Sequence, residues 1–235
     1  MDVLVADLHE DRAALRQQLA HHRQPVAQIG QVGVDAVFPG VFSMLDISQK
    51  QYFNPLRVKE ISETLPDGVV DTKIADKFIT SRGLDDLKGR LFKLGGKADL
   101  ILKFEDGTYG VIDNKTTKIR ENQEYYFYQL ESYATILENP DYPTACKFLE
   151  ANRKYYYKPV THMGLSMFEP ARIIDHTTET ITQLYRRKWM PIKRDPQKLL
   201  EKITSMMDII TLEECPDASS CNRCNLYKSA LDKSN

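Results

Sequence analysis

The spacing of hydrophobic and polar positions changes several times after residue 37, and each change indicates a new element of secondary structure. Apolar residues at helical spacing predict helices at 43–53, 122–138 and 196–210. Shorter apolar or alternating runs predict strands at 68–74, 77–80, 155–168, 172–176 and 189–192, a connection at 83–89, and a hairpin within 96–115. This order of elements predicts a mixed α/β (α+β) domain with a central sheet flanked by helices.

Two of the predicted helices carry more specific signals. Asp195 followed by Pro196 is an N-cap with proline at the first helical position, which is a common way for a helix to begin. In the helix at 43–53 we expect the apolar side chains to be buried against the sheet. These side chains are Met44, Leu45, Ile47 and Tyr52.

The length of the loop in the predicted hairpin decides which residues of its two strands lie opposite each other. Residues 105–107 end in Gly107, and a three-residue loop normally ends with a residue in the left-handed region, which glycine adopts at low cost. In that register Phe104 pairs with Thr108, and the two positions of every pair lie on the same face of the sheet. A two-residue turn at Asp106 and Gly107 would shift the register by one residue.

With the three-residue loop, Asp99 lies opposite Asp113 and Lys97 lies opposite Lys115, all on one face. The neighbouring strand positions are apolar on both faces, so we expect the two carboxylates to be partly removed from water. Two like charges about 5 Å apart destabilise a strand pair unless something offsets them. A solvated charge ladder, in which each aspartate pairs with a lysine, is one solution, and a bound cation is the other.

A divalent cation between Asp99 and Asp113 would remove the repulsion, and hard oxygen ligands of this kind suit Mg²⁺ or Mn²⁺. Lys115 lies two residues after Asp113 on the same face. It could orient a water molecule or neutralise charge that develops on a phosphate. The hairpin therefore predicts a site for metal-assisted hydrolysis.

Composition limits the class of protein without identifying a partner. The chain has 235 residues, of which 42% are hydrophobic, and its 32 basic and 33 acidic residues nearly cancel. It has neither an apolar run of about 20 residues, which a membrane span requires, nor the layout of a secretion signal. We expect a soluble, cytoplasmic protein with no membrane partner.

The ends of the chain differ in composition from the middle. Residues 1–36 contain no lysine, phenylalanine, tyrosine or tryptophan, and we expect them to form a poorly ordered or atypical segment. A sharper hypothesis is that this segment is not native to the domain. Residues 37–212 form the predicted domain. Residues 213–235 form a tail with three cysteines, Cys215, Cys221 and Cys224. Crowded cysteines in a reducing compartment indicate a metal or cluster site more than a disulfide framework.

Three motifs in order resemble the PD-(D/E)XK nuclease superfamily, and within it the RecB-like exonuclease branch that includes CRISPR-associated RecB-type nucleases. The motifs are Gly96-Lys97-Ala98-Asp99, then Ile112-Asp113-Asn114-Lys115-Thr116-Thr117, then Gln129-Leu130-Glu131-Ser132-Tyr133. The last one matches the Gln-x-x-x-Tyr pattern that follows the catalytic lysine in that branch. The resemblance covers roughly residues 39–227 and implies a restriction-endonuclease-like core.

The resemblance also implies a role for each matching residue. Asp99, Asp113 and Lys115 would be catalytic, Asp99 and Asp113 would bind the metal with the backbone carbonyl of Asn114, and Asp46 would stand at the place of the family's helical metal ligand. Gln129 and Tyr133 would contact substrate. From the residues alone, Asp46 could equally be a solvated helix residue or an N-cap, and Gln129 and Tyr133 could simply pack in an amphipathic helix.

The tail cysteines are similar to those of iron–sulfur members of the same branch. In those members a [4Fe-4S] cluster also takes one cysteine from before the nuclease core, and residues 1–145 contain none. Three thiolates do not complete a four-cysteine site, so Cys146 would have to be the fourth ligand of a cluster or of Zn²⁺. Free thiols are the remaining alternative.

The sequence thus predicts a Mg²⁺- or Mn²⁺-dependent DNA nuclease that hydrolyses phosphodiester bonds in single- or double-stranded DNA. DNA repair, recombination and CRISPR adaptation are the pathways that the resemblance suggests. The basic and aromatic runs at 153–158 and 186–189 could hold DNA, although tyrosines of a buried strand explain the first run equally well. The alternatives are a weakly active or inactive nucleic-acid-binding module with the same fold, and a structural protein that uses the hairpin as a charge ladder.

Overall fold

A computed structural model describes residues 40–53, 57–71, 77–121, 124–141 and 157–211. The predicted N-terminal segment at 1–36, the four cysteines and most of the basic run at 153–158 lie outside these residues. In the described part of the chain, no helix is both long and apolar enough to cross a membrane.

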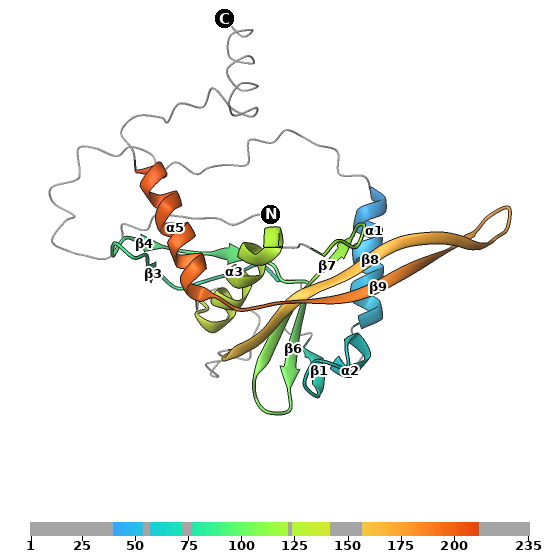
Figure 1. Cartoon of the computed structure of the whole chain (residues 1–235), viewed down its shortest axis with the longest axis horizontal. Coiled ribbons are helices and arrows are strands. Elements are labelled where there is room, and N and C mark those ends of the chain that lie inside the picture. The colour runs from blue at the N-terminus through green and yellow to red at the C-terminus, as the bar shows by residue number, and fades with distance from the viewer. Residues whose placement is uncertain (1–39, 54–56, 72–76, 122–123, 142–156, 212–235) are drawn as a thin grey trace, which may run out of the picture.

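A mixed sheet of five strands forms the centre of the protein (Figure 1). Its order is β1 (Gly68–Asp71), β6 (Leu100–Phe104), β7 (Tyr109–Thr116), β8 (Val160–His176) and β9 (Ile181–Ile192). All neighbours are antiparallel except β7 and β8, which are parallel. Parallel neighbours need a crossover, and α3 (Phe127–Glu138) lies within the segment that connects them.

The remaining elements surround this sheet. They are α1 (Gly40–Phe53), α2 (Val58–Ile61), the 3₁₀ turn η1 (Glu124–Tyr126), α5 (Pro196–Ile210), and two short ladders, β2 (Ile79–Thr80) with β5 (Gly95–Gly96) and β3 (Leu84–Asp85) with β4 (Leu91–Phe92). The predicted connection at 83–89 thus contains a short strand. The predicted cap of α5 is confirmed, because the Asp195 side chain accepts a hydrogen bond from the Lys198 amide at 3.0 Å. The architecture is the predicted α+β, restriction-endonuclease-like core.

The predicted register of the β6–β7 hairpin is confirmed. Leu100 pairs with Ile112, and Lys103 pairs with Tyr109. The Gly107 amide donates to the Phe104 carbonyl at 3.1 Å, which closes the three-residue loop, and Gly107 has a φ of 84°. The same register continued one step beyond Leu100 brings Asp99 opposite Asp113.

Replacing Gly107 by alanine should lower the free energy of unfolding by about 1 kcal/mol, because a Cβ is strained at positive φ. No atom lies within 4 Å of the place where that Cβ would be, so the backbone alone determines the cost. Urea unfolding measures the change, and Glu105→Ala in the same loop is the control. Equal effects of the two substitutions would contradict the assigned backbone conformation.

Both faces of the sheet are covered, as the apolar neighbours of the two aspartates predict. On one face, Ile101 and Val111 pack with Leu130 and Ala134 of α3 and with residues of α5. On the other face, a second core joins residues of β6 and β7 to α1 and α2. Its buried members are Phe53, Val58, Ile61, Leu65, Val70, Leu100, Leu102, Phe104 and Ile112.

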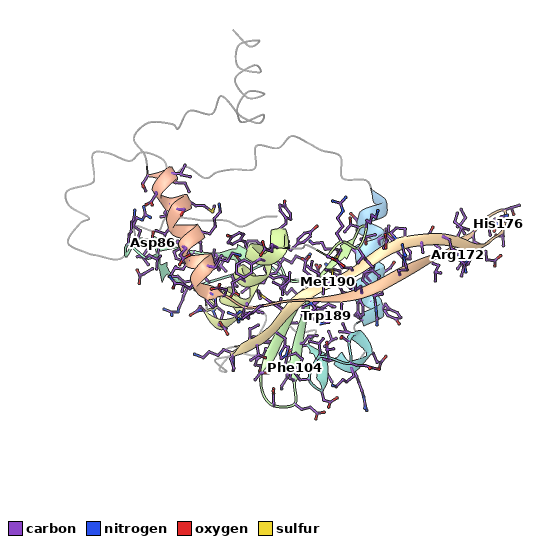
Figure 2. The ribbon with its side chains drawn as sticks, viewed as in Figure 1. Asp86, Phe104, Arg172, His176, Trp189 and Met190 are labelled. Atoms are coloured by element: carbon purple, nitrogen blue, oxygen red, sulfur yellow. The ribbon has the colours of Figure 1, made fainter. Side chains whose placement is uncertain are left out.

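The β8–β9 pair differs from the three separate strands that the sequence predicts. The two strands form one continuous ribbon, and its far end projects beyond the body of the protein (Figure 1). Arg172 and His176 lie on this projecting end, whereas Trp189 and Met190 lie where β9 crosses the body (Figure 2). Every residue from 170 to 182 is exposed, so no burial pattern marks the strands there.

The expected burial of α1 is largely wrong. Met44 is 63% exposed, and Ile47 and Tyr52 also face outward, whereas Phe53 is fully buried. The helix contacts the sheet through Phe53 and through polar residues, since Gln49 Nε2 donates to Thr116 Oγ1 at 2.8 Å. A search for an apolar stripe therefore selects the wrong face of this helix.

Candidate active site

Strand β7 brings Asp113 and Lys115 to the face of the sheet that α3 covers. Residues two apart on a strand share a face, and the Lys115 Nζ lies 2.5 Å from Asp113 Oδ2. Asp113 is only 3% exposed. Asp99 comes from the neighbouring chain segment just before β6, and its Oδ2 accepts a hydrogen bond from the Asn114 amide at 2.8 Å. The hairpin thus brings both predicted carboxylates and the predicted lysine together.

Burial raises the pKa of Asp113 from 3.8 to about 6. The ammonium of Lys115 acts against this rise, and the nearby Asp99 adds to it. Asp113 Oδ1 accepts a hydrogen bond from Gln129 Nε2 at 3.0 Å. Asp113 Oδ2 is buried and receives no well-aligned hydrogen bond from the described residues, although Lys115 forms an ion pair with it. Asp113, which the sequence predicts as a metal ligand, thus has a raised pKa because its carboxylate is buried.

Helix α3 brings the Gln-x-x-x-Tyr residues to the same place. Gln129 and Tyr133 are four residues apart and share a helical face, and Gln129 Nε2 also donates to Tyr133 Oη at 2.8 Å. The Tyr133 ring lies so close to Gly96 that a Cβ there would come within 2.6 Å of it. Gly96 and Tyr133 are thus packed together, which supports the packing alternative for Tyr133 without excluding contact between its hydroxyl and substrate.

Helix α1 contributes a residue that the sequence analysis missed. Lys50 Nζ lies 2.8 Å from Asp46 Oδ2 and 3.1 Å from Asp99 Oδ1. Asp46 and Lys50 are four residues apart, so the sequence could have suggested this pair. The contact between Lys50 and Asp99 joins α1 to a segment about 50 residues away in the sequence, just before β6, and no spacing in the sequence indicates it.

The oxygen atoms at this site suit a hard divalent cation. Asp113 Oδ2 is buried without a well-aligned hydrogen bond, and Asp99 Oδ1 points toward a cationic group, Lys50. In the part of the chain that the structure describes, no three His, Cys, Asp or Glu side chains form a ready-made metal group. Two lysines lie among the carboxylates instead. The residues fit a cation held by two carboxylates and a backbone carbonyl, with a third carboxylate, Asp46, beyond Lys50.

The side chain of Asn114 points away from these carboxylates. Residues next to each other on a strand face opposite sides, and both polar atoms of the Asn114 amide are buried without a partner among the described residues. Only the backbone of Asn114 is therefore available to the carboxylate cluster. The family resemblance assigns this backbone, through its carbonyl, to the metal.

The basic and aromatic runs are partly structural. Tyr157 is buried and packs edge-on against Tyr109, with ring centroids 5.0 Å apart. Arg187 donates to the Glu60 carbonyl at the end of α2, and Arg186 pairs with Glu169. These two arginines therefore have partners within the protein, while the Arg186 side chain stays largely exposed.

A hollow of about 960 Å³ lies between the start of α3 and the connection from β9 to α5. Its lining includes Phe127, Met190, Arg194 and Lys198, and none of the clustered carboxylates. The hollow therefore lies apart from the cluster formed by Asp99, Asp113 and Lys115.

Comparison with known proteins gives one match. The family model described as PD-(D/E)XK nuclease superfamily matches residues 6–229, nearly the whole chain. No curated protein and no solved structure matches.

Proposed function

Because this chain belongs to the PD-(D/E)XK nuclease superfamily, we propose that it is a Mg²⁺- or Mn²⁺-dependent deoxyribonuclease of the RecB-like branch. The observation that supports this most strongly is the convergence of Asp113 and Lys115 on β7 with Asp99 from the segment just before β6. The superfamily match supports a nuclease in general. DNA as substrate, the RecB-like branch and a role in DNA repair belong to the proposal.

The proposed cation ligands are Asp99, Asp113 and the backbone carbonyl of Asn114, with Asp46 as a further carboxylate on α1. When bound, such a cation supplies Lewis-acid polarisation of the phosphoryl oxygen and lowers the pKa of a water molecule. The buried position of Asp113 favours this role, because its raised pKa shows that the neighbouring Lys115 compensates the cost of burying its charge only in part. A carboxylate of this kind gains more from a cation than a solvated one does.

The protein's own residues position the substrate and stabilise charge. Lys115 can turn from Asp113 toward the scissile phosphate, hold the attacking water and offset negative charge in the transition state. Its Nζ also lies 4.9 Å from the centre of the Tyr126 ring, which restricts the ammonium to this side of the sheet. Gln129 holds Asp113 Oδ1, and its neighbour Tyr133 presents a hydroxyl that could donate to a phosphate.

Lys115→Ala should lower the rate of metal-dependent DNA cleavage by about a hundredfold or more, as expected when a positioned charge is lost from a transition state. Labelled single- and double-stranded DNA incubated with Mg²⁺ or Mn²⁺ provides the assay. Lys103→Ala is the matched control, because Lys103 is exposed on the same hairpin. If Lys115→Ala cleaves DNA at the wild-type rate, Lys115 does not have the proposed catalytic role.

A nucleic-acid-binding module with little or no activity is the second candidate. The observation that favours it is the absence of a ready-made group of three metal-binding side chains in the described residues. Two results together would support it. The protein would bind DNA without metal and without cleaving it, and its Mn²⁺ binding would depend on neither Asp99 nor Asp113. A cluster or Zn²⁺ at Cys146, Cys215, Cys221 and Cys224 stays a prediction, and visible absorbance and metal analysis of anaerobically purified protein would test it.

A further inference from the structure

The ammonium of Lys50 has an unusual position for a helix lysine. A lysine four residues after an aspartate commonly makes a solvated surface pair. Here the Lys50 side chain is only 17% exposed, and its Nζ reaches across to Asp99, whose side chain is 16% exposed. The second contact therefore places the lysine inside the cluster of carboxylates instead of on the outer face of α1.

The two facing carboxylates of the hairpin each have an ammonium beside them. Lys115 pairs with Asp113, and Lys50 pairs with Asp99. The repulsion between opposed aspartates is thus offset by two lysines, without a bound cation. Lys50 Nζ touches Asp46 and Asp99 together, so it stands where a cation shared by these two carboxylates would stand.

The docking of α1 keeps Lys50 in this place. Gln49, the preceding residue, donates to Thr116 at the end of β7, and Phe53 is buried in the core on that face of the sheet. Both contacts fix the helix relative to the strands that carry the site. Because the lysine side chain is long and flexible, its ammonium can leave Asp99 for water while the helix stays in position.

We propose that Lys50 is an internal competitor of the divalent cation. It occupies Asp99 and Asp46 in the metal-free protein and is displaced when a divalent cation binds. This inference rests on the proposed metal-dependent function and adds a positioning residue that sets how much divalent cation the enzyme needs. The physical reason is that binding must first break the Lys50–Asp99 ion pair, which reduces the apparent affinity for the cation.

Isothermal titration of Mn²⁺ into the wild type, Lys50→Met and Lys118→Met tests the proposal without DNA. Methionine keeps the length and apolar character of the lysine stem and removes the ammonium. Lys50→Met should bind Mn²⁺ about tenfold more tightly, the size typical of changes next to metal ligands. Lys118 is exposed three residues after Lys115, so Lys118→Met measures the effect of losing one nearby positive charge. It should change the affinity by less than about twofold.

A second measurement does not depend on how Lys50→Met folds. Brief acetylation of the wild-type protein, followed by mass spectrometry, reports how reactive each lysine is. Saturating Mg²⁺ should increase acetylation of Lys50 several-fold, because its ammonium is released into water. The increase should vanish in Asp113→Asn.

Equal effects of Lys50→Met and Lys118→Met on Mn²⁺ affinity would overturn the proposal, and so would a Lys50 reactivity that Mg²⁺ leaves unchanged in the wild type. Either result leaves the proposed function intact as long as wild-type Mn²⁺ binding is lost in Asp113→Asn. If the wild type shows no Mn²⁺ binding that depends on Asp113, the metal site fails and the competition fails with it.

Discussion

Asp113→Asn should abolish metal-dependent DNA cleavage, with a loss of about a thousandfold or more. The substitution removes one of the two charges proposed to hold the cation and leaves Lys115 without its ion-pair partner. Because an amide is close in shape to a carboxylate, Gln129 can still donate to the side-chain oxygen at this position. The loss should therefore come from the missing charge and not from a collapsed site.

The same substitution should not weaken the fold. At pH 7.5 without divalent cations, the free energy of unfolding of Asp113→Asn should exceed that of the wild type by about 3 kcal/mol, since the pKa of Asp113 in the folded protein is raised from 3.8 to about 6. A raised carboxylate pKa means that ionised Asp113 destabilises the folded state. This cost is fully present above about pH 6 and fades as the pH falls toward 3.8, so the advantage of asparagine should fade too.

Urea unfolding at several pH values in the presence of a chelator measures this effect. Asp106→Asn is the matched control, because Asp106 lies in the loop at the other end of the hairpin, where hydrogen bonds from Thr108 lower the pKa of its carboxyl. Asp106→Asn should keep full cleavage activity. A marked loss of stability in Asp113→Asn would show that Asp113 supports the fold, and the assignment of its charge to metal binding would then lose its main physical argument.

Arg194→Met should lower the free energy of unfolding by about 3–5 kcal/mol, the cost of leaving a buried charge without its partner. Arg194 donates to Glu131 Oε1 at 2.8 Å and lies 3.1 Å from Glu138 Oε2. Glu131 is fully buried, and its other oxygen accepts from the Asp195 amide at 2.9 Å. These bonds join α3 to the junction between β9 and α5, so their loss would weaken the contact between these elements.

The matched control for this prediction is Arg172→Met, because Arg172 lies on the exposed ribbon of β8 and β9. Chemical unfolding followed by circular dichroism compares the two variants. Neutralising the partners as well, in the triple variant Arg194→Met, Glu131→Gln, Glu138→Gln, should recover much of the loss, since no buried charge then remains. A change below about 1 kcal/mol in Arg194→Met would contradict the assigned role.

The central hairpin was predictable because its determinants are local. Gly107 at the end of the loop selects a three-residue turn, and the turn alone sets which residues face each other. The cap at Asp195 and the shared face of Gln129 and Tyr133 are local in the same sense. Each depends on residues a few positions apart, and backbone geometry relates such residues before any tertiary structure exists.

The ribbon of β8 and β9 was only partly predictable, because its outer half has no buried face. Hydrophobic periodicity arises where a strand packs on a core, and residues 170–182 do not pack on one. Backbone hydrogen bonds between the two strands continue there regardless of side-chain type. The sequence therefore shows separate short strands where the protein has a continuous pair.

By itself the sequence determined the loop, the register and therefore the face-to-face placement of Asp99 and Asp113. The sequence also placed Lys115 beside Asp113, but only the tertiary structure brought the ammonium of Lys50 to Asp99. Lys50 reaches Asp99 because α1 docks on the sheet through Gln49 and Phe53. Packing against the rest of the protein sets this orientation of the helix, and the apolar pattern of the helix itself does not predict it. Electrostatic contacts between distant segments depend on distances of a few ångströms that folding sets, and no spacing along the chain encodes them.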